Sequence, residues 1–306
     1  MRIVALITGS IEEQILCFPT LETLKHEYPG AIIDVIANPN AKLAYGLCPY
    51  VHETLAFNYE DTNGLADYLN LLGTIRDREY DVAILTESNW ALELLLWLNG
   101  IPRRIGFKKQ SSWFLSNAVP AKKEQYHPNY YHDLLQGLGI TAVCPALDIK
   151  VNAEDTDWLK VQQQSLGIEN DNYIVLFGGE GYYPINYWQN IIDSLETQQP
   201  SQAIVILPNI QESPWLEELQ KICPNVQLLS PPDVGKLAAI IKQANLLICT
   251  SGIPLVIATG LGTQTFALVT PEEKLKLLPA NQDRYVGIQA SSIADIAPDL
   301  ILSQIQ

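Results

Sequence analysis

The sequence predicts an α/β protein made of two similar halves, each with a parallel sheet covered by helices. Short β-branched runs alternate with helical patterns along the whole chain. Several of these runs are apolar at successive positions, as is typical of strands buried on both faces of a parallel sheet. With 306 residues, 47% hydrophobic and 17% charged, the chain is also long and apolar enough to form two domain cores.

The first half, residues 1–148, begins with a strand and then repeats the strand–helix pattern. Strands are expected at Arg2–Ile7, Ala31–Ala37, Val51–Phe57, Val82–Leu85 and Arg104–Phe107. Helices are expected at Ile15–Tyr28, Leu65–Arg78 and Ala91–Leu98. The extended, proline-containing stretch Cys144–Asp148 then predicts the linker between the two domains.

The second half, residues 149–306, follows the same plan. Strands are expected at Tyr173–Phe177, Ala203–Leu207, Val226–Leu229, Leu246–Cys249 and Thr265–Val269. Helices are expected at Trp188–Leu195, Pro214–Cys223 and Val234–Ala244, after Thr250–Gly252, and at Ser292–Ile305, the last packing near the domain junction. Two such halves usually hold a ligand between the carboxyl ends of their strands, so the sheets are expected to face each other across a cleft.

Composition and charge exclude several classes of function. The formal charge of −15 disfavours duplex nucleic acid as a partner, because phosphate binding depends on clustered Lys and Arg. Five scattered cysteines without a CxxC pair, and only four histidines, predict neither a disulfide framework nor a metal site. The N-terminus is interpreted as a strand instead of a signal peptide, and no apolar stretch is long enough to span a membrane. We therefore expect a cytoplasmic protein.

Four groups of motifs follow one another in a fixed order. The first is PTLETL with YPGAIID, within Phe18–Asp34. The second combines Pro102–Phe107, Leu115–Pro120, His127 and Leu134–Gly139. The third is a glycine-rich turn at Gly178 with Tyr183, Pro184 and Trp188, and the fourth combines Thr250–Gly252 with Gly262 and Thr263. In order and spacing, over most of the chain, they resemble glycosyltransferase family 9, the heptosyltransferase-like enzymes.

The resemblance implies a GT-B fold, in which the N-terminal domain binds the acceptor and the C-terminal domain binds a nucleotide-sugar donor. It also implies an inverting transfer of a heptose-like sugar to a lipopolysaccharide core or another surface glycan, without metal or cofactor. The acceptor is then an anionic saccharide or glycolipid, which is compatible with a peripheral position at the inner membrane. The family's catalytic base is an acidic residue at the first loop–helix junction, which corresponds to Glu13 here.

Glu13 has a second interpretation that needs no catalysis. Ser10 and Glu13 have the S-x-x-E spacing of a capping box, in which the glutamate folds back onto the N-cap residue. Acidic residues in a first helical turn are also favoured by the helix dipole. The sequence leaves both roles open, namely a base that removes the proton of the acceptor hydroxyl and a structural cap.

On the donor side, the resemblance assigns the nucleotide to two loops. It places the turn at Gly178 and Gly179, the helix start from Thr250 to Ile253, and Glu212 around the donor. Backbone N–H groups at Ser251 and Gly252 would face the pyrophosphate. The expected contacts are Gly178, Gly179, Glu212, Thr250, Ser251, Gly252 and Ile253.

Three positions depart from the family pattern. Thr250 replaces an aspartate, Leu255 replaces a histidine, and Gly181 replaces a lysine. Losing cationic donors near a departing pyrophosphate slows transfer, since one such group is worth about 10²–10³ in rate. A catalytically eroded relative that serves as a binding or assembly module is therefore the alternative to the enzyme.

On the acceptor side, a basic cluster is unusual for so acidic a chain. It consists of Arg103, Arg104, Lys108 and Lys109, and with Ser10 it predicts the binding of an anionic saccharide. The alternative is a solvated surface turn. A dinucleotide-binding oxidoreductase is excluded, because the third glycine of a GxGxxG motif falls on Pro184.

Overall fold

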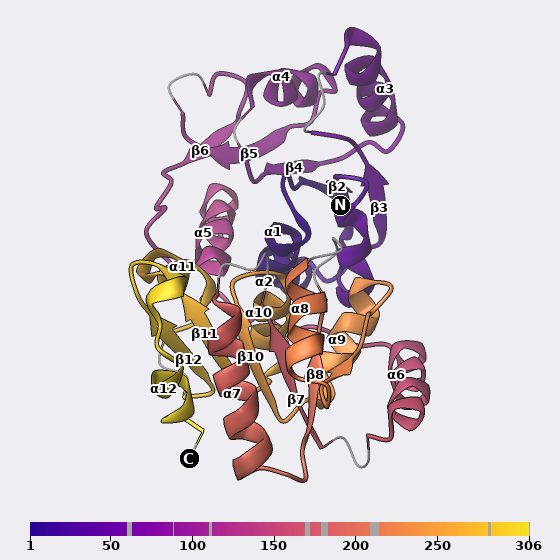
Figure 1. The fold of residues 1–306 in the computed structure, drawn as a ribbon. Helices are drawn as coiled ribbons and strands as arrows, with labels where there is room; N and C mark the ends of the chain where they lie inside the picture. Colours follow the sequence, from indigo (N-terminus) through magenta and orange to yellow (C-terminus); the bar gives the residue numbers. More distant parts are fainter. Residues whose placement is uncertain are drawn as a thin grey trace. The chain divides into compact units, whose positions relative to one another are not determined.

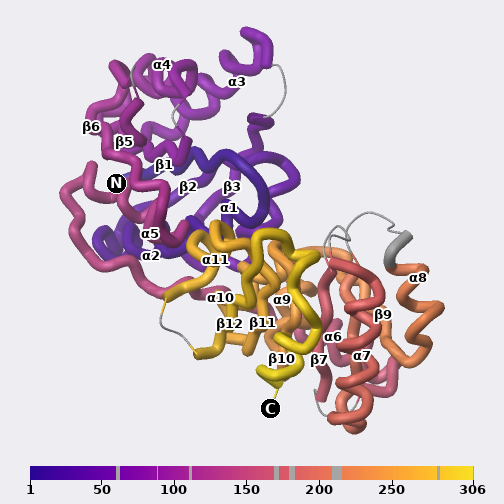
Figure 2. The backbone as a smooth tube through the Cα atoms, turned by 60° about the vertical axis from the view of Figure 1, so that its left-hand side comes forward, coloured from indigo at the N-terminus to yellow at the C-terminus, as the bar shows by residue number. Residues whose placement is uncertain are grey.

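The computed structural model describes residues 1–59, 63–87, 89–109, 112–168, 172–178, 183–208, 214–280 and 283–305. The chain divides into two compact units, Met1–Asp148 and Ile149–Gln306. Each unit is formed by one continuous segment, as the unmixed colours of the backbone tube show (Figure 2). Among the described residues, no helix is long and apolar enough to cross a membrane.

The first unit is a six-stranded parallel sheet between two helical layers (Figure 1). Its strands are β1 Arg2–Leu6, β2 Ile32–Ala37, β3 Glu53–Ala56, β4 Val82–Leu85, β5 Arg103–Phe107 and β6 Asn117–Val119. Its helices are α1 Ile11–Leu16, α2 Phe18–Glu27, α3 Leu65–Arg76, α4 Trp90–Leu98 and α5 His127–His132, with 3-10 turns at Ala41–Leu47 and Asp133–Leu138. Helices α3 and α4 cover one face of the sheet, and α1, α2 and α5 cover the other.

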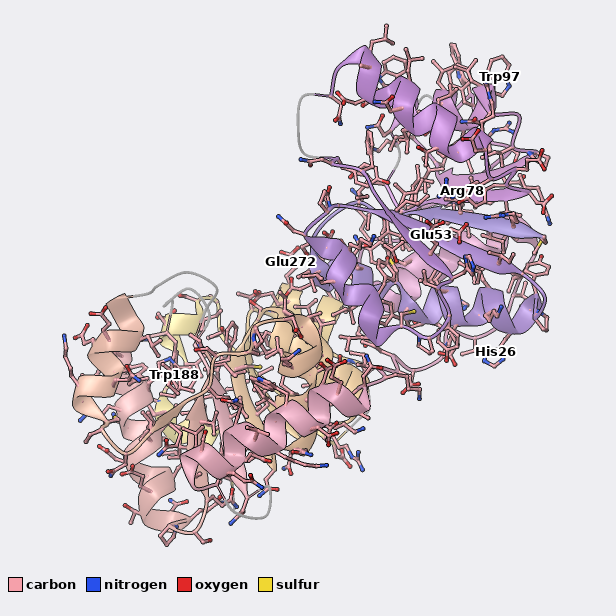
Figure 3. All side chains as sticks on the ribbon, turned by 90° about the vertical axis from the view of Figure 1, so that its right-hand side faces the viewer. His26, Glu53, Arg78, Trp97, Trp188 and Glu272 are labelled. Carbon is pink, nitrogen blue, oxygen red and sulfur yellow. The ribbon has the colours of Figure 1, made fainter. Side chains whose placement is uncertain are left out.

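The second unit repeats this arrangement. Its strands are β7 Tyr173–Phe177, β8 Ala203–Ile206, β9 Gln227–Leu228, β10 Leu246–Thr250, β11 Thr265–Val269 and β12 Tyr285–Gln289. Its helices are α6 Ala153–Leu166, α7 Ile185–Gln198, α8 Pro214–Ile222, α9 Val234–Gln243, α10 Ile253–Leu261, α11 Pro271–Leu277 and α12 Pro298–Leu302. Helices α7, α8 and α12 enclose a core centred on the fully buried Trp188 (Figure 3).

The strand order is the same in both sheets and creates one switch point in each. The orders are β3-β2-β1-β4-β5-β6 and β12-β11-β10-β7-β8-β9. The chain leaves β1 towards one side and returns to β4 on the other, and β7 and β10 are related in the same way. In such sheets, ligands bind at the carboxyl ends of the strands beside the switch point. The predicted fold class, two Rossmann-like parallel sheets, is confirmed.

Two predicted helices differ from the structure. The expected helix at Ile15–Tyr28 is two helices, because α1 begins earlier, at Ile11, and the chain turns at Cys17 before Pro19 opens α2. The expected terminal helix is a 3-10 turn at Ile293–Asp295 followed by the short α12. Proline fits the first turn of a helix and not its interior, so Pro298 begins α12. Helix α12 packs on α7, and its expected place at the domain junction stays a prediction.

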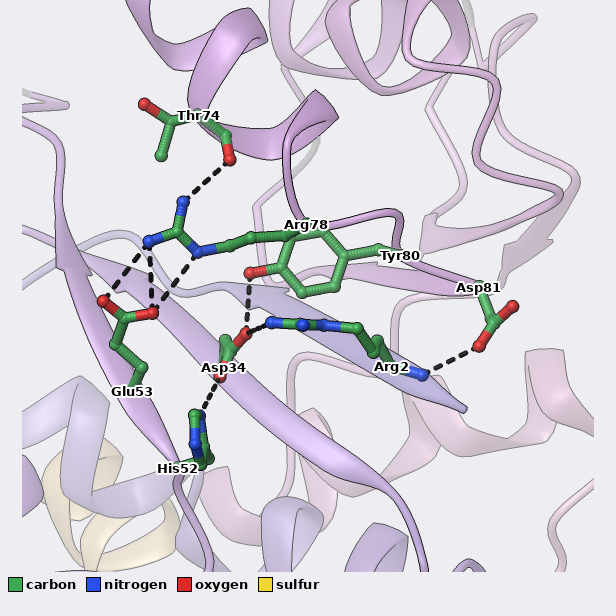
Figure 4. Close-up of polar contacts among 8 residues, drawn as sticks. All are labelled: Arg2, Asp34, His52, Glu53, Thr74, Arg78, Tyr80 and Asp81. Carbon is green, nitrogen blue, oxygen red and sulfur yellow. Dashed lines mark hydrogen bonds and ion pairs between the residues drawn. The ribbon is translucent and has the colours of Figure 1, made fainter.

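A buried polar network joins the amino ends of four strands in the first unit (Figure 4). Asp34 on β2 is fully buried and accepts hydrogen bonds from Arg2 Nη2 at 3.1 Å and from the Tyr80 hydroxyl at 2.8 Å. His52 Nδ1 lies 3.1 Å from its other carboxylate oxygen. Buried carboxylates need such partners, so this network is a structural element at the edge opposite the carboxyl ends of the strands.

Candidate functional site

The loop after β1 lies at the switch point of the first sheet and connects to the loop after β4. The Thr8 N–H donates to Thr86 Oγ1 at 3.3 Å, and the Thr8 hydroxyl donates to Glu87 Oε2 at 3.1 Å. Glu87 is exposed at this edge. The two loops therefore present hydroxyl and carboxylate groups at the place where parallel α/β sheets bind ligands.

Glu13 lies in the first turn of α1 and folds back over this loop. Its Oε2 atom accepts the Ser10 N–H at 2.9 Å, and the capping box is formed. Its carboxylate lies against Gly9, where an added Cβ would be 1.8 Å from Glu13 Oε2. Gly9 also has φ +96°, a conformation that favours glycine. A carboxylate has about four acceptor sites, so the cap leaves capacity for a substrate proton.

Buried polar side chains hold the β1–α1 loop in place. Gln14 is fully buried, its Nε2 donates to the Ile7 carbonyl at 3.0 Å, and its Oε1 accepts from the Tyr45 hydroxyl at 2.6 Å. Asn38 Nδ2 donates to the Gly9 carbonyl at 3.3 Å. These contacts connect the loop to β2 and to the turn that follows it, so hydrogen bonds hold the loop that precedes Glu13 in place.

Tyr131 of α5 is the second side chain that reaches Glu13. Burial raises the pKa of its hydroxyl, and the nearby Cys17 and Glu13 raise it further. The phenol therefore stays protonated and can donate a hydrogen bond to an anionic neighbour. Sequence reasoning missed Tyr131, Gly9 and Glu87. Only Gly9 left a signal, as a glycine directly after a strand and before a helix.

The predicted basic cluster is divided between the two edges of the sheet, which corrects the expectation of one acceptor patch. Lys108 and Lys109 follow β5 and lie at the carboxyl edge, which also carries Glu13 and Ser10. Arg103 and Arg104 begin β5 and lie at the opposite, amino edge. Because all strands run in parallel, residues at the start of a strand lie at the opposite edge of the sheet from residues that follow the end of a strand.

The Arg104 side chain is also committed to the local main chain. Its Nε donates to the Phe114 carbonyl at 2.5 Å, and its Nη1 donates to the Ile101 carbonyl. The Arg103 Nη2 atom lies 3.1 Å from Met1 Sδ. Arg104 therefore holds the loop after β5 in place, and neither arginine joins the site at Glu13.

At the second switch point, the structure brings Gly178 together with the start of α10. Gly178 directly follows β7, and Cys249 of β10 pairs with Phe177, so the ends of both strands are level. Gly252 has φ +142°, and a Cβ there would be 3.2 Å from the Phe177 ring. The predicted set from Thr250 to Ile253 therefore lies beside Gly178. Gly179, Gly181 and Glu212 lie outside the described residues.

A carboxylate occupies the vicinity of the expected pyrophosphate site. The Ser251 hydroxyl donates to Glu273 Oε1 at 2.6 Å, and Glu273 Oε2 accepts from the Thr270 N–H at 2.7 Å and the Thr270 hydroxyl at 2.8 Å. Burial would raise the pKa of Glu273, but the hydrogen bonds from Ser251 and Thr270 hold it below its usual value. Glu273 is therefore a stable anion beside the place where a phosphate was expected.

The first turn of α10 is also a weak donor of hydrogen bonds to an anion. Pro254 at its start has no N–H, and the Leu255 N–H donates to the Gly252 carbonyl at 3.0 Å. The Leu255 side chain is fully buried, at the position where the family pattern has a histidine. A leucine in the core cannot replace a cation that contacts a donor phosphate.

The loops that follow the strands of the second unit contain further acidic residues besides Glu273. The segments 178–184, 207–213, 229–233, 251–252, 270–273 and 290–292 follow the six strands in turn. They contain five acidic residues and no Lys or Arg; the acids are Glu180, Glu212, Asp233, Glu272 and Glu273. Asp233 is ion-paired with Lys236, and Glu272 is ion-paired with Lys276. Glu273 is therefore the described acid of this set that would repel an anionic nucleoside diphosphate.

Other parts of the described chain are weaker candidates for a binding or catalytic site. A hollow of about 520 Å³ lies between β3 and α3 and is lined by residues that include Phe57, Asp67 and Asn70; Glu13 is not among its lining residues. Within the described ranges, no group of three or more His, Cys, Asp or Glu side chains could hold a metal ion. The two switch points are therefore the strongest candidate sites.

Comparison with known proteins identifies the family. The model of glycosyltransferase family 9 (heptosyltransferase) matches residues 68–294. Lipopolysaccharide heptosyltransferase 3 of Escherichia coli is 23% identical over 84% of this chain and 78% of its own length. The photosynthetic NDH subunit of subcomplex B 1, a chloroplast protein of Arabidopsis thaliana, is 20% identical over 96% of this chain and 71% of its own length.

A solved structure supports the same fold. The Escherichia coli ADP-heptose lipopolysaccharide heptosyltransferase II has a TM-score of 0.81 to this chain at 16% identity, covering 100% of this chain and 97% of its own. At that identity the likeness concerns the fold, which is the GT-B arrangement of two Rossmann-like units. Because the family model covers most of its length, the chain belongs to glycosyltransferase family 9, the heptosyltransferase family.

Proposed function

We propose that the protein is an inverting, metal-independent sugar transferase that uses Glu13 as its base and a nucleotide-sugar as its donor. The observation that carries this proposal is the Glu13 carboxylate at the switch point of the first sheet, folded over Gly9 and close to Tyr131. Membership of the family and likeness to an ADP-heptose enzyme support the donor class.

The proposed step needs one proton acceptor and one leaving group. An acceptor hydroxyl bound at the edge with Glu13 attacks the anomeric carbon of the donor, and Glu13 takes the hydroxyl proton. The bond from the anomeric carbon to the diphosphate breaks, and its electron pair leaves with the nucleoside diphosphate. Attack from the opposite side inverts the configuration. Main-chain N–H groups at Gly252 and Ile253 face the departing charge in this proposal.

The acceptor is proposed to be an anionic saccharide or glycolipid, such as a lipopolysaccharide core. Lys108 and Lys109 support this class, because they lie at the same edge of the sheet as Glu13. Their ammonium groups are exposed and would meet carboxylate or phosphate groups of a saccharide. The curated relative that transfers heptose onto lipopolysaccharide points in the same direction.

A second candidate is a relative that keeps the fold as a binding or assembly module and transfers no sugar. Glu273 beside Ser251 and the buried Leu255 favour it, because each weakens donor binding. The chloroplast relative, named as a subunit of a subcomplex, shows similarity across nearly the whole chain. The two candidates differ in whether the protein turns over a donor.

Substitution of Glu13 distinguishes the candidates. Glutamine can still accept the Ser10 N–H, so the Tm of Glu13→Gln should stay close to that of the wild type. It cannot take a proton, so turnover should fall by about 10²–10⁴. Glu12→Gln is the matched control, because it removes the same charge from the same turn of α1 and should leave turnover within a few-fold.

The measurement is donor turnover with ADP-, UDP- and GDP-sugars in the presence of lipopolysaccharide core oligosaccharide. Loss of activity in Glu13→Gln but not in Glu12→Gln supports the base. Equal activity of wild type and Glu13→Gln removes Glu13 from the mechanism. A wild type that neither turns over nor binds any of these donors favours the binding module.

A further inference from the structure

Helix α4 is apolar on its inner and on its outer side. Leu92, Leu95 and Leu96 face the core of the first unit and are buried. At about 100° per residue, a second group of apolar side chains lies on the opposite side of the helix. Its members are Trp90, Leu94, Trp97 and Leu98. The outer helix of a lone domain carries polar residues on that side, whereas a helix that is apolar all round is normally covered.

The outer side chains of α4 are exposed, and the loop after β5 extends them. Trp90 is 65% exposed and Trp97 is 51% exposed. Phe114 packs on Trp97 with ring centroids 5.8 Å apart, and its neighbour Trp113 is 86% exposed. Figure 3 shows Trp97 at the outer surface of the first unit. We call this surface the tryptophan face; its residues are Trp90, Leu94, Trp97, Leu98, Trp113 and Phe114.

The area of the tryptophan face matches what a stable dimer needs. A tryptophan side chain offers about 200 Å² for burial, so the three indoles expose roughly 400 Å² together. Leu98, half exposed, adds to this area. A standard interface buries about 800 Å² on each partner, of which about 60% is apolar. The tryptophan face therefore supplies most of the apolar area of one side of such an interface.

The segments that form the tryptophan face expose no charge, although the whole chain has a formal charge of −15. Segments 89–100 and 112–116 contain a single charged residue, Glu93, and its side chain is fully buried. In a two-fold symmetric contact, a charge near the axis meets the same charge of the other copy, which is unfavourable. A face without exposed charge therefore suits association of this acidic chain with itself, whereas a basic partner would be bound through acidic residues.

The order of the outer side chains along α4 is symmetric about the middle of the helix. Leu94 is central, with Trp90 four residues before it and Leu98 four residues after it. With a two-fold axis at Leu94, the α4 helices of two copies run antiparallel, and Trp90 of each copy packs against Leu98 of the other. Such a contact is closed, because both copies use the same patch, so it produces a dimer and not a filament.

We propose that two copies of this chain associate through the tryptophan face, with their α4 helices antiparallel about a two-fold axis at Leu94. The apolar area, the absence of exposed charge and the symmetric order of the side chains each support a second copy as the occupant. Phe114, which packs on Trp97, and its neighbour Trp113 extend the contact beyond the helix. The proposal does not depend on sugar transfer.

Analytical ultracentrifugation of the full-length protein, without donor or acceptor, tests this association. The wild type should sediment as a dimer with a Kd in the micromolar range or below, as standard-size interfaces do. Trp90→Glu and Leu98→Lys should each raise the Kd at least about tenfold, because each buries a charge against apolar side chains. The helix dipole favours an acid in the first turn and a cation in the last, so both variants should keep the fold, which circular dichroism checks.

Val143→Glu and Val143→Lys are the matched controls, because Val143 is 91% exposed but lies outside the tryptophan face. Both should dimerise as the wild type does. A wild type that stays monomeric up to about 100 μM overturns the proposal, and so does a dimer whose Kd is unchanged in either Trp90→Glu or Leu98→Lys. A Leu98→Lys dimer that is tighter than the wild type also overturns it, because the opposing surface is then an acidic region instead of a second tryptophan face.

Discussion

Glu273 is the residue whose charge should matter most for donor binding. Its carboxylate accepts the Ser251 hydroxyl at 2.6 Å, beside the first turn of α10. In Glu273→Gln the side-chain amide oxygen can accept from the Thr270 N–H, and the amide NH2 can donate to Ser251 Oγ, so the loop keeps a hydrogen bond to each partner and loses one negative charge. If the nucleotide binds at this turn, the substitution should strengthen binding.

The size of the effect follows from the geometry. A phosphate at the first turn of α10 would lie about 5 Å from the Glu273 carboxylate, and two unit charges at that distance repel by about 3 kcal/mol at an effective dielectric of ~20. Glu273 is only partly buried, so solvent and salt reduce this repulsion to about 1–2 kcal/mol. We therefore expect the Kd of ADP to fall by about 5- to 30-fold.

Isothermal titration calorimetry of the purified protein with ADP measures this change. Glu272→Gln is the control, since it removes the same charge one residue earlier, where the side chain is exposed and forms an ion pair with Lys276. Its ADP affinity should change by less than about threefold. The reasoning fails if Glu273→Gln binds ADP no more tightly than the wild type, or if both variants gain equally.

Two further predictions concern the stability of the first unit. Asp34→Asn should lower the free energy of unfolding, measured by urea titration, by about 2–3 kcal/mol, because Asp34 is fully buried and bonded to Arg2 and Tyr80. The control is Asp81→Asn, at an exposed contact with Met1, which should lower the same free energy by less than about 1 kcal/mol. Burial lowers the pKa of His132 below 6.5, although Asp133 opposes this, so the unfolded state binds the proton more readily and stability should fall as pH drops below about 6.5. Thermal unfolding at several pH values should show a smaller loss in His132→Asn, and an identical pH profile would contradict the assignment.

Local sequence patterns were sufficient to predict most strands, the parallel sheets and the junction that carries Glu13. They missed the strands β6 and β12, each of which lies at one edge of its sheet. Tyr173–Phe177 and Val82–Leu85 are strands with the predicted bounds, because a short apolar run between turn signals is itself the condition for a buried strand. The capping box at Ser10 is equally local, since its two residues are three positions apart. The direction of the strands was also predictable, and it already assigns Arg103 to the amino edge.

Contacts between distant loops required the tertiary structure. Ser251 and Glu273 are 22 positions apart, and they meet because β10 and β11 are paired side by side. Tyr131 reaches Glu13 because α5 packs on α1, and Phe114 reaches Trp97 because the loop after β5 folds onto α4. Periodicity and caps determine each element from its own residues. Which side chains meet at the ends of the strands is determined by how separate strand–helix units pack, and no local pattern encodes that packing.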